Sequence, residues 1–217
     1  MDEVLRVLQM LKAGKIRREE AERLLAALGV GPSSEEGVRR WLRIEGGQAT
    51  IRVVPAPGDA VSASGFGAGK TILTTDETGG LLKIEAQGPK LFKKAFRVEL
   101  KLPRDYGVEL ALGAGALRAE SLAGLKGELG TGRLEAAGIR ELDFELGMGT
   151  ARLGLLLKAG EHRLELGMGD VEIYPLPGAS FRIEGEAGLG QVEGRVFGEG
   201  RARLLVELGM GRLKVES

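Results

Sequence analysis

The first 28 residues have the hydrophobic spacing of two short helices. Leucines recur at helical intervals in two sets: Leu5, Leu8 and Leu11, then Leu24, Leu25 and Leu28. The residues between the sets, Ala-Gly-Lys-Ile at 13–16, interrupt this spacing, so we predict a helical hairpin over residues 1–28. Each helix is shorter than the roughly 12 to 15 residues at which isolated helices are stable in water. We therefore expect the apolar face of the hairpin to dock on another surface.

A change of period after residue 36 marks a domain boundary. Residues 29–36 (GVGPSSEE) have the composition of a linker. Alternating apolar and polar positions follow, and we predict strands at Trp41–Ile44, Thr50–Val54, Leu81–Glu85 and Phe96–Leu102. The glycines of this β-rich region, residues 37–105, do not fit the repeat that follows. The sequence therefore leaves open whether the region continues that repeat or forms a separate antiparallel cap.

An internal repeat built on a Glu-Leu-Gly-x-Gly unit fills residues 106–217. Its glycine pairs are Gly113/Gly115, Gly130/Gly132, Gly147/Gly149, Gly167/Gly169, Gly188/Gly190 and Gly209/Gly211, spaced 17, 17, 20, 21 and 21 residues apart. Mostly apolar residues stand directly before each pair and two and four positions after it, which gives three apolar columns. Such columns at a fixed period are the signature of stacked coils. We predict an all-β fold, a parallel β-solenoid (β-helix) of 17–21-residue coils.

The residue between the two glycines is mostly apolar. These residues are Ala114, Thr131, Met148, Met168, Leu189 and Met210. We predict that this side chain points into the core, while the glycines let the backbone turn without a clash at Cβ. In particular, we interpret the three methionines as inward-facing fillers of the core.

Two further columns carry charge. Three positions after the pairs stand Arg118, Glu135, Arg152, Glu172, Glu193 and Lys214, which predicts a ladder of ion pairs, each worth about 0.2 to 1 kcal/mol. Two positions before the pairs stand Glu128, Glu145, Glu165, Glu186 and Glu207, whose carboxylates repel one another unless something neutralises them. Divalent cations could do so, and so could Arg163, Arg182 and Arg203. We favour the arginines and predict no metal, because single carboxylates at equal spacing do not converge on one point.

Composition narrows the functional classes. Lysine plus arginine (31) equals aspartate plus glutamate (31), so no net charge attracts nucleic acid or an anionic membrane. Cysteine is absent, and the single histidine, His162, has no second histidine with which to share a metal, so we expect it at the surface or a corner. The N-terminus lacks the features of a signal peptide, and no apolar stretch is long enough to insert into a membrane, so we expect a cytoplasmic protein. The absence of asparagine suggests a thermophilic source.

Two segments resemble a known family. Val98–Leu125, in which Leu-Lys-Leu-Pro precedes a strand, a Gly-x-Gly turn and another strand, resembles the bacterial "putative-adhesin" solenoid domains. Leu11–Leu25 (LKAGKIRREEAERLL) resembles the SHOCT-like helical hairpin that often precedes such domains in cytoplasmic members. Arg17 departs from the pattern, because a Ser or Thr cap is usual there. The resemblance implies a β-solenoid and an association with envelope-stress systems, and it supplies no catalytic residues.

One glycine-rich segment comes close to a phosphate-binding loop. Residues Ser64–Thr71 (SGFGAGKT) match G-x-x-x-x-G-K-[ST] except at Ser64, which replaces the first glycine. Such a loop needs a following helix whose N-terminal amides hold the phosphates. Here the residues after Lys70 are β-branched and strand-like. We favour a turn between strands and keep a nucleotide-binding enzyme that uses Lys70 and Thr71 as the alternative.

The pattern as a whole favours a non-enzymatic structural or interaction protein without a cofactor. We predict a self-associating cytoplasmic scaffold or an envelope-stress-related module. Homo-oligomers are expected to form through an uncapped last coil, which ends at Leu213–Ser217, or through the hairpin. In a further hypothesis the leucines of the hairpin bind a protein partner. We expect no nucleic acid partner.

Overall fold

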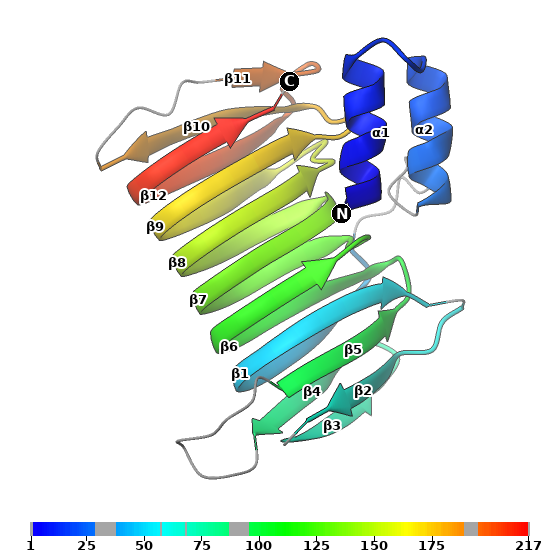
Figure 1. The fold of residues 1–217 in the computed structure, drawn as a ribbon, viewed down its shortest axis with the longest axis vertical. Helices are drawn as coiled ribbons and strands as arrows, with labels where there is room; N and C mark the ends of the chain where they lie inside the picture. The colour runs from blue at the N-terminus through cyan, green and yellow to red at the C-terminus, as the bar shows by residue number, and fades with distance from the viewer. Residues whose placement is uncertain are drawn as a thin grey trace.

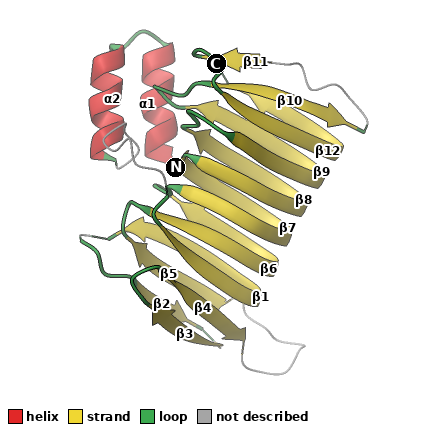
Figure 2. Ribbon diagram, turned by 180° about the vertical axis from the view of Figure 1, so that it is seen from behind, coloured by secondary structure: helices red, strands yellow, loops and turns green. Residues whose placement is uncertain are grey.

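The computed structural model of the chain describes residues 2–28, 38–56, 58–67, 69–86, 96–188 and 195–216. The protein is mostly β, with two short N-terminal helices and one largely parallel sheet (Figure 1). Its long strands lie one above another along the long axis of the molecule. The helices lie beside the upper part of this stack, at one edge, as both ribbon views show (Figure 2).

The N-terminal hairpin forms where the leucine spacing predicts it. Helix α1 spans Asp2–Lys12 and α2 spans Arg18–Ala27, with Gly14 in a left-handed conformation (φ +67°) between them. Arg17 is the N-cap of α2 and makes no side-chain capping bond. Glu19 and Glu20 lie in the first turn, where carboxylates offset the positive end of the helix dipole.

Six long strands form the middle of the sheet and pair in parallel, with one shift of register between β7 and β8, at Ala137–Ile139. They are β1 (Arg40–Pro55), β6 (Tyr106–Ala119), β7 (Gly124–Ile139), β8 (Glu141–Leu155), β9 (Glu161–Pro175) and β12 (Ala202–Val215). Each of them curls round at one edge of the stack, so its two halves lie on opposite sides of the molecule (Figure 1).

The glycine pairs lie in the middle of the long strands. The second glycine of each described pair has a positive φ, between 137° and 155° at Gly115, Gly132, Gly149, Gly169 and Gly211. An added Cβ at any of these positions would overlap the carbonyl oxygen of the corresponding residue in the neighbouring strand. Glycine is therefore required there by the close approach of successive strands as well as by the backbone angle. Gly190 lies outside the described residues.

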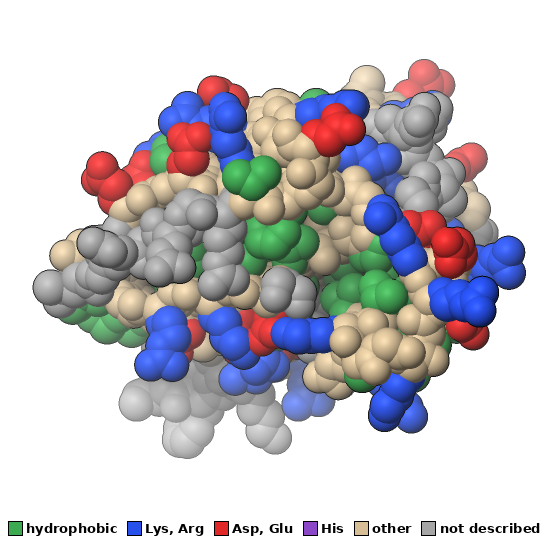
Figure 3. Space-filling model, turned by 90° about the horizontal axis from the view of Figure 1, so that it is seen from above, with side chains coloured by type: hydrophobic (Ala, Val, Ile, Leu, Met, Phe, Trp, Pro, Cys, Tyr) green, Lys and Arg blue, Asp and Glu red, His purple; other side chains and the backbone are tan. Residues whose placement is uncertain are grey.

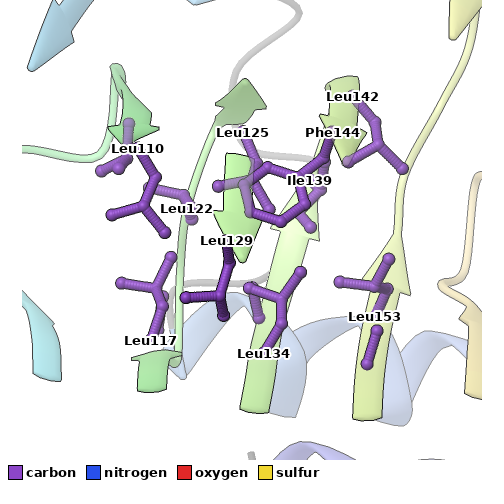
Figure 4. Packing of buried hydrophobic residues seen from close by; sticks show 14 of the residues in the cluster. Leu110, Leu117, Leu122, Leu125, Leu129, Leu134, Ile139, Leu142, Phe144 and Leu153 are labelled. Atoms are coloured by element: carbon purple, nitrogen blue, oxygen red, sulfur yellow. The ribbon is translucent and has the colours of Figure 1, made fainter. Parts of the chain in front are cut away.

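The core lies between the two halves of the strands. The predicted apolar columns supply it: Leu129, Leu146 and Leu166 before the glycine pairs, and Leu117 and Leu134 after them, are all buried. Figure 4 shows leucines from successive strands pointing toward one another in this interior. The sequence period thus identified these columns on either side of the glycine pairs as inward-facing.

The order of the last strands differs from the order of the repeats. Strand β12 lies between β9 and β10 (Phe181–Ala187), so the final repeat pairs with the one that begins at Glu161. The predicted uncapped last coil is therefore wrong along Ala202–Leu208, because β10 covers this part of β12. The short strand β11 (Arg195–Phe197) pairs antiparallel with β10 outside it.

The other end of the sheet is built from residues 62–102. Strand β4 (Gly79–Ala86) pairs in parallel with the first half of β1, and β5 (Phe96–Leu102) pairs with its second half. Two antiparallel strands lie outside them: β3 (Gly69–Thr75) on β4 and β2 (Ser62–Phe66) on β5. The β-rich region before the repeats therefore does both things that the sequence left open. Its strands β1, β4 and β5 continue the parallel sheet, and β2 and β3 add an antiparallel end.

Strand β1 is a copy of the repeat that the glycine spacing did not reveal. Its register places Gln48 opposite Ala114 and Ala49 opposite Gly115. Gly47 therefore corresponds to the first glycine of a pair, and Ala49 replaces the second. On its other side Ala49 pairs with Phe96, the first residue of β5. In the described part of the chain, no strand bends round continuously beside Ala49 on that side, so β1 does not need the second glycine of the inner strands.

Candidate interaction surfaces

Three methionines form a continuous exposed strip on the edge where the strands curl. Met148, Met168 and Met210 are 48%, 40% and 44% exposed. Met148 pairs in register with Met168, and Met168 pairs with Met210, so the three side chains come from adjacent strands about 4.8 Å apart. We call these three residues the methionine row. The expectation that they fill the core is wrong.

The outward direction of the methionine row follows from the bend. In a regular strand, alternate side chains point the same way, so a residue two positions after a buried leucine would be buried as well. Leu146 and Ala151 are both buried although they are five positions apart, an odd number, so the alternation breaks between them. The positive φ of Gly149 supplies this break. The middle residue of the Gly-Met-Gly corner therefore lies on the convex side of the bend.

The apolar face of the hairpin docks on the sheet. Its buried side chains, Val4, Val7, Ala21 and Leu25, form one cluster with Ala137, Leu156 and Leu176 at the ends of β7, β8 and β9. Leu8, Leu11 and Leu28 are half-buried against the same cluster, whereas Leu24 is 38% exposed. The side chain of Leu5 lies outside the described set. The hairpin leucines therefore contact the protein's own sheet, and Leu24 is the most exposed of those described.

A cavity of about 740 Å³ lies between α1 and the end of the sheet. Leu8 and Leu11 line it from the helix, and Leu176 and Phe197 line it from the sheet. Seen from this end, apolar side chains lie in a hollow among charged ones (Figure 3). The Nζ atom of Lys12 lies 3.6 Å from a carboxylate oxygen of Glu216 across the cavity, so an ion pair links the hairpin to the last strand.

Tyr174, which lines this cavity, has a strongly raised pKa. Burial, together with a 2.8 Å hydrogen bond that its hydroxyl donates to Glu172, raises the pKa of Tyr174 to about 12. Arg152 also pairs with Glu172, at 2.9 Å. A phenol with so high a pKa stays protonated near neutral pH, and the carboxylate beside it is already paired. This arrangement supports structure and does not poise a group for proton transfer.

The predicted ion-pair ladder is present along the outward column after the glycines. Arg118 lies 3.4 Å from Glu135, and Arg152 lies 2.9 Å from Glu172. The strand order extends the alternation of charge, because Lys214 of β12 is the register partner of Glu172. Glu193, which the repeat order places next to Glu172, lies outside the described residues.

The five glutamates before the glycine pairs stand next to one another in register. Their spatial order is Glu128, Glu145, Glu165, Glu207 and Glu186. Arg163 lies 2.8 Å from Glu165 and 3.2 Å from Glu207. Arg182 and Arg203 pair instead with Glu184, at 3.0 and 2.8 Å. Of the three arginines, only Arg163 is thus seen to pair with the column, and the expectation that Arg182 and Arg203 neutralise it is wrong. Among the described residues, no group of three or more carboxylate or histidine ligands converges on one point.

The segment Ser64–Thr71 does not have the form of a phosphate-binding loop. Lys70 and Thr71 lie within strand β3, where Lys70 is the register partner of Glu85, so no helix N-terminus follows the glycines. Gly65 and Gly69 serve packing, because an added Cβ at either position would overlap the buried ring of Phe96.

His162 lies in the core, not at the surface or a corner as predicted. It is 8% exposed, and its register partner in β12 is the buried Leu204. Its Nδ1 accepts a hydrogen bond from the amide of Leu142 (3.3 Å), and its Nε2 donates one to the carbonyl of Ala159 (3.0 Å). Burial lowers the pKa of His162 below its usual value. Both ring nitrogens of the neutral side chain are thus satisfied, as expected of a structural core histidine.

The comparisons with known proteins match the two parts of the chain. Residues 2–33 match the family described as a SHOCT-like domain. A solved "putative cell adhesion protein" from Clostridium sporogenes is 18% identical, with a TM-score of 0.51 over 82% of this chain and 92% of that chain. A "putative adhesin" from Bacteroides fragilis is 10% identical, with a TM-score of 0.35 over 83% of this chain and 93% of that chain. No curated protein matches the chain.

These findings confirm the resemblance seen in the sequence: a SHOCT-like hairpin precedes a domain with the fold of proteins named as adhesins. In the parts of the chain that the structure describes, no helix is long and apolar enough to cross a membrane.

Proposed function

We propose that the protein is a non-enzymatic interaction protein whose sheet is a β-solenoid scaffold that presents the methionine row to a protein partner. The observation that carries this proposal is the in-register exposure of three methionines at glycine-flanked corners of adjacent strands. Methionine adapts its shape to an apolar partner, and contiguous exposed apolar strips mark interaction surfaces.

The solenoid interpretation is supported by the repeated coil. Successive long strands pair in parallel and keep their register through the glycine corners, and their buried columns face one another between the two halves. Each repeat buries its apolar face on its neighbours, which is the energetic basis of a solenoid. A stack of this kind places identical positions of successive repeats in straight rows, and the methionine row is such a row.

A non-enzymatic role is supported by the chemistry of the surface. The carboxylates of the charged columns are paired with arginine or stand singly, and His162 has both nitrogens bonded in the core. The alternative of a nucleotide-dependent enzyme has no support from Lys70, which projects from an edge strand. We extend the proposal to a cytoplasmic scaffold that serves an envelope-stress system, on the ground of the SHOCT-like hairpin.

Affinity capture with three versions of the full chain tests the proposal. The wild type, a variant in which all three residues of the methionine row are changed to glutamine, and the matched control Leu24→Gln are used as bait in lysate of the source organism. Specific partners should bind the wild type and Leu24→Gln and be lost from the triple variant, because only that variant removes the apolar strip. The same proteins captured by all three baits would reject the methionine row as the binding surface.

Calorimetry with ATP and magnesium tests the enzymatic alternative. We expect no heat of binding for the wild type or for Lys70→Ala. Heat that is present in the wild type and lost in Lys70→Ala would reject the non-enzymatic role.

A further inference from the structure

Strand β3 is an edge strand of the sheet. It is the last strand of the sheet at the N-terminal end, and among the described residues its only strand partner is β4. Its seven residues contain no proline and keep an uninterrupted register. Edge strands normally avoid pairing with other chains through prolines, bulges or several charges. Here Ile72 is 38% exposed, and Lys70 is the one charge within the strand.

The hydrogen-bonding pattern shows which backbone groups of β3 face outward. The amide of Asp76 donates to the carbonyl of Gly79 (3.0 Å), which closes the hairpin between β3 and β4. In an antiparallel ladder, alternate residues direct their N–H and C=O groups to the same neighbour. Residues 70, 72 and 74 therefore bond to β4. The backbone groups of Thr71, Leu73 and Thr75 point away from the sheet.

We propose that β3 pairs antiparallel with β3 of a second copy of this chain, across a two-fold axis at Leu73. In this register Leu73 lies opposite its own counterpart, and Thr71 lies opposite Thr75 of the partner copy. These are the three residues whose backbone groups face outward, so each finds a hydrogen-bonding partner. The pairing joins the two sheets end to end through their antiparallel edges.

Two charges, Lys70 on the strand and Asp76 directly after it, single out this register. Lys70 then stands opposite Asp76 of the partner copy, and the two-fold axis creates this ion pair twice. A register centred on Ile72 would instead place Lys70 opposite Thr74. The side chain of Asp76 is held in place by its own turn, because its Oδ1 accepts hydrogen bonds from the amide and hydroxyl of Thr78 at 2.8 and 2.7 Å. These bonds keep the carboxylate oriented at the end of the strand.

The geometry also sets the strength and size of the assembly. One seven-residue strand pair buries much less than the roughly 1,000 Å² that a stable interface needs, so we expect a weak dimer that depends on protein concentration. The two-fold interface is closed, because each copy uses its β3 edge once. The assembly therefore stops at the dimer and does not form filaments.

Sedimentation velocity over a concentration series tests the dimer. The wild type should shift from the 23.0 kDa monomer toward twice that mass as the concentration rises. Lys70→Glu should weaken the dimer about tenfold or more, because it places a second carboxylate against Asp76 at both ends. Lys83→Glu is the matched control, since Lys83 is an exposed cation on β4, one strand away from the edge.

A second pair of variants tests the backbone pairing. Thr71→Pro removes an outward N–H group and should weaken the dimer, whereas Thr71→Ala keeps that group and should not. Circular dichroism shows whether each variant remains folded. If Thr71→Pro does not fold, Lys70→Glu still decides the matter.

Cysteine trapping tests the register, because the chain has no cysteine of its own. In the proposed register Ile72 and Thr74 of the partner copy form a non-hydrogen-bonded pair with Cα atoms about 4.5 Å apart, within disulfide reach. The double variant Ile72→Cys/Thr74→Cys should therefore give a disulfide-linked dimer under mild oxidation. Either single variant should not.

Three outcomes would overturn the proposal. They are a monomer at every concentration, a dimer that is unchanged in both Lys70→Glu and Thr71→Pro, and efficient trapping of the Ile72→Cys single variant. The last outcome would show a register centred on Ile72. None of these experiments involves the methionine row, so the dimer and the proposed partner surface can fail independently.

Discussion

Replacing Gly149 with alanine is the most direct test of how the strands are packed at their bends. Gly149 has φ +145°, and an added Cβ would lie far closer than 3.0 Å to the carbonyl oxygen of Gly132 in the neighbouring strand. A side chain at such a backbone angle costs about 1 to 3 kcal/mol. Relief of the overlap also requires β7 and β8 to separate, which weakens ladder hydrogen bonds worth about 1 kcal/mol each. We expect Gly149→Ala to lower the free energy of unfolding by about 3 kcal/mol or more.

Two other glycines separate the cost of the backbone angle from the cost of the overlap. Gly160 has φ +88°, but the nearest atom to an added Cβ, Nε2 of His162, is 4.0 Å away. Gly160→Ala should therefore lower the free energy of unfolding by the cost of the backbone angle alone, about 1 to 2 kcal/mol. Gly47 occupies the first-glycine position of β1, its φ is not positive, and nothing lies within 4 Å of an added Cβ. Gly47→Ala should be neutral or stabilise by about 0.4 to 1 kcal/mol.

Urea denaturation measures all three variants with one probe. Trp41 is the single tryptophan, and its ring lies over Gly107 and Gly124 of the two following strands, so its fluorescence reports on the sheet. Circular dichroism of the strands should give the same midpoints. If Gly149→Ala is no more destabilising than Gly160→Ala, the close approach of the bends does not constrain the glycines, and the reasoning is refuted.

Three further predictions concern the exposed row, the core histidine and the hairpin. Under mild peroxide the methionine row should be oxidised faster than the partly buried Met10, as peptide mapping will show, and equal rates would contradict the exposure. Burial depresses the pKa of His162, so below about pH 6.5 the unfolded chain binds a proton that the folded chain does not. The free energy of unfolding should therefore decrease as the pH is lowered below this value. The urea midpoint of His162→Gln should lack this part of the pH dependence. Leu25→Ala should weaken the packing of the hairpin on the sheet by about 2 to 5 kcal/mol. Amide hydrogen exchange should become faster in α1 and α2 but not in β7. Equally faster exchange in all three elements would show that the hairpin and the sheet unfold together.

Much of the fold follows from the spacing of apolar residues. The leucine spacing predicted both helices, and the alternation at Phe96–Leu102 predicted β5 with the bounds that the structure has. The columns around the glycine pairs predicted the buried positions, because stacked strands must bury the same face of each repeat. Periodicity reports which face of an element is buried, and these predictions needed nothing else.

The order of the strands could not be predicted from periodicity, because every repeat offers the same face to every other. The sequence did carry a signal in its charges. If the repeats stack in chain order, Glu172 lies next to Glu193, which places like charges side by side. The observed order sets Lys214 beside Glu172, and an alternating column results. Complementarity between outward columns therefore contains information on strand order that the apolar columns lack.

The methionine row shows why the candidate interaction surface escaped the sequence reasoning. Two-residue alternation predicts an inward side chain between the glycines, and this holds only while the backbone stays in the β region. A glycine with positive φ breaks the alternation, so the same apolar residue moves from the core to the surface. In a Gly-x-Gly corner that repeats along a stack, the identity of x is consequently free of packing constraints. Methionine at three adjacent corners then needs an explanation outside the core, and the proposed contact with a protein partner would supply it.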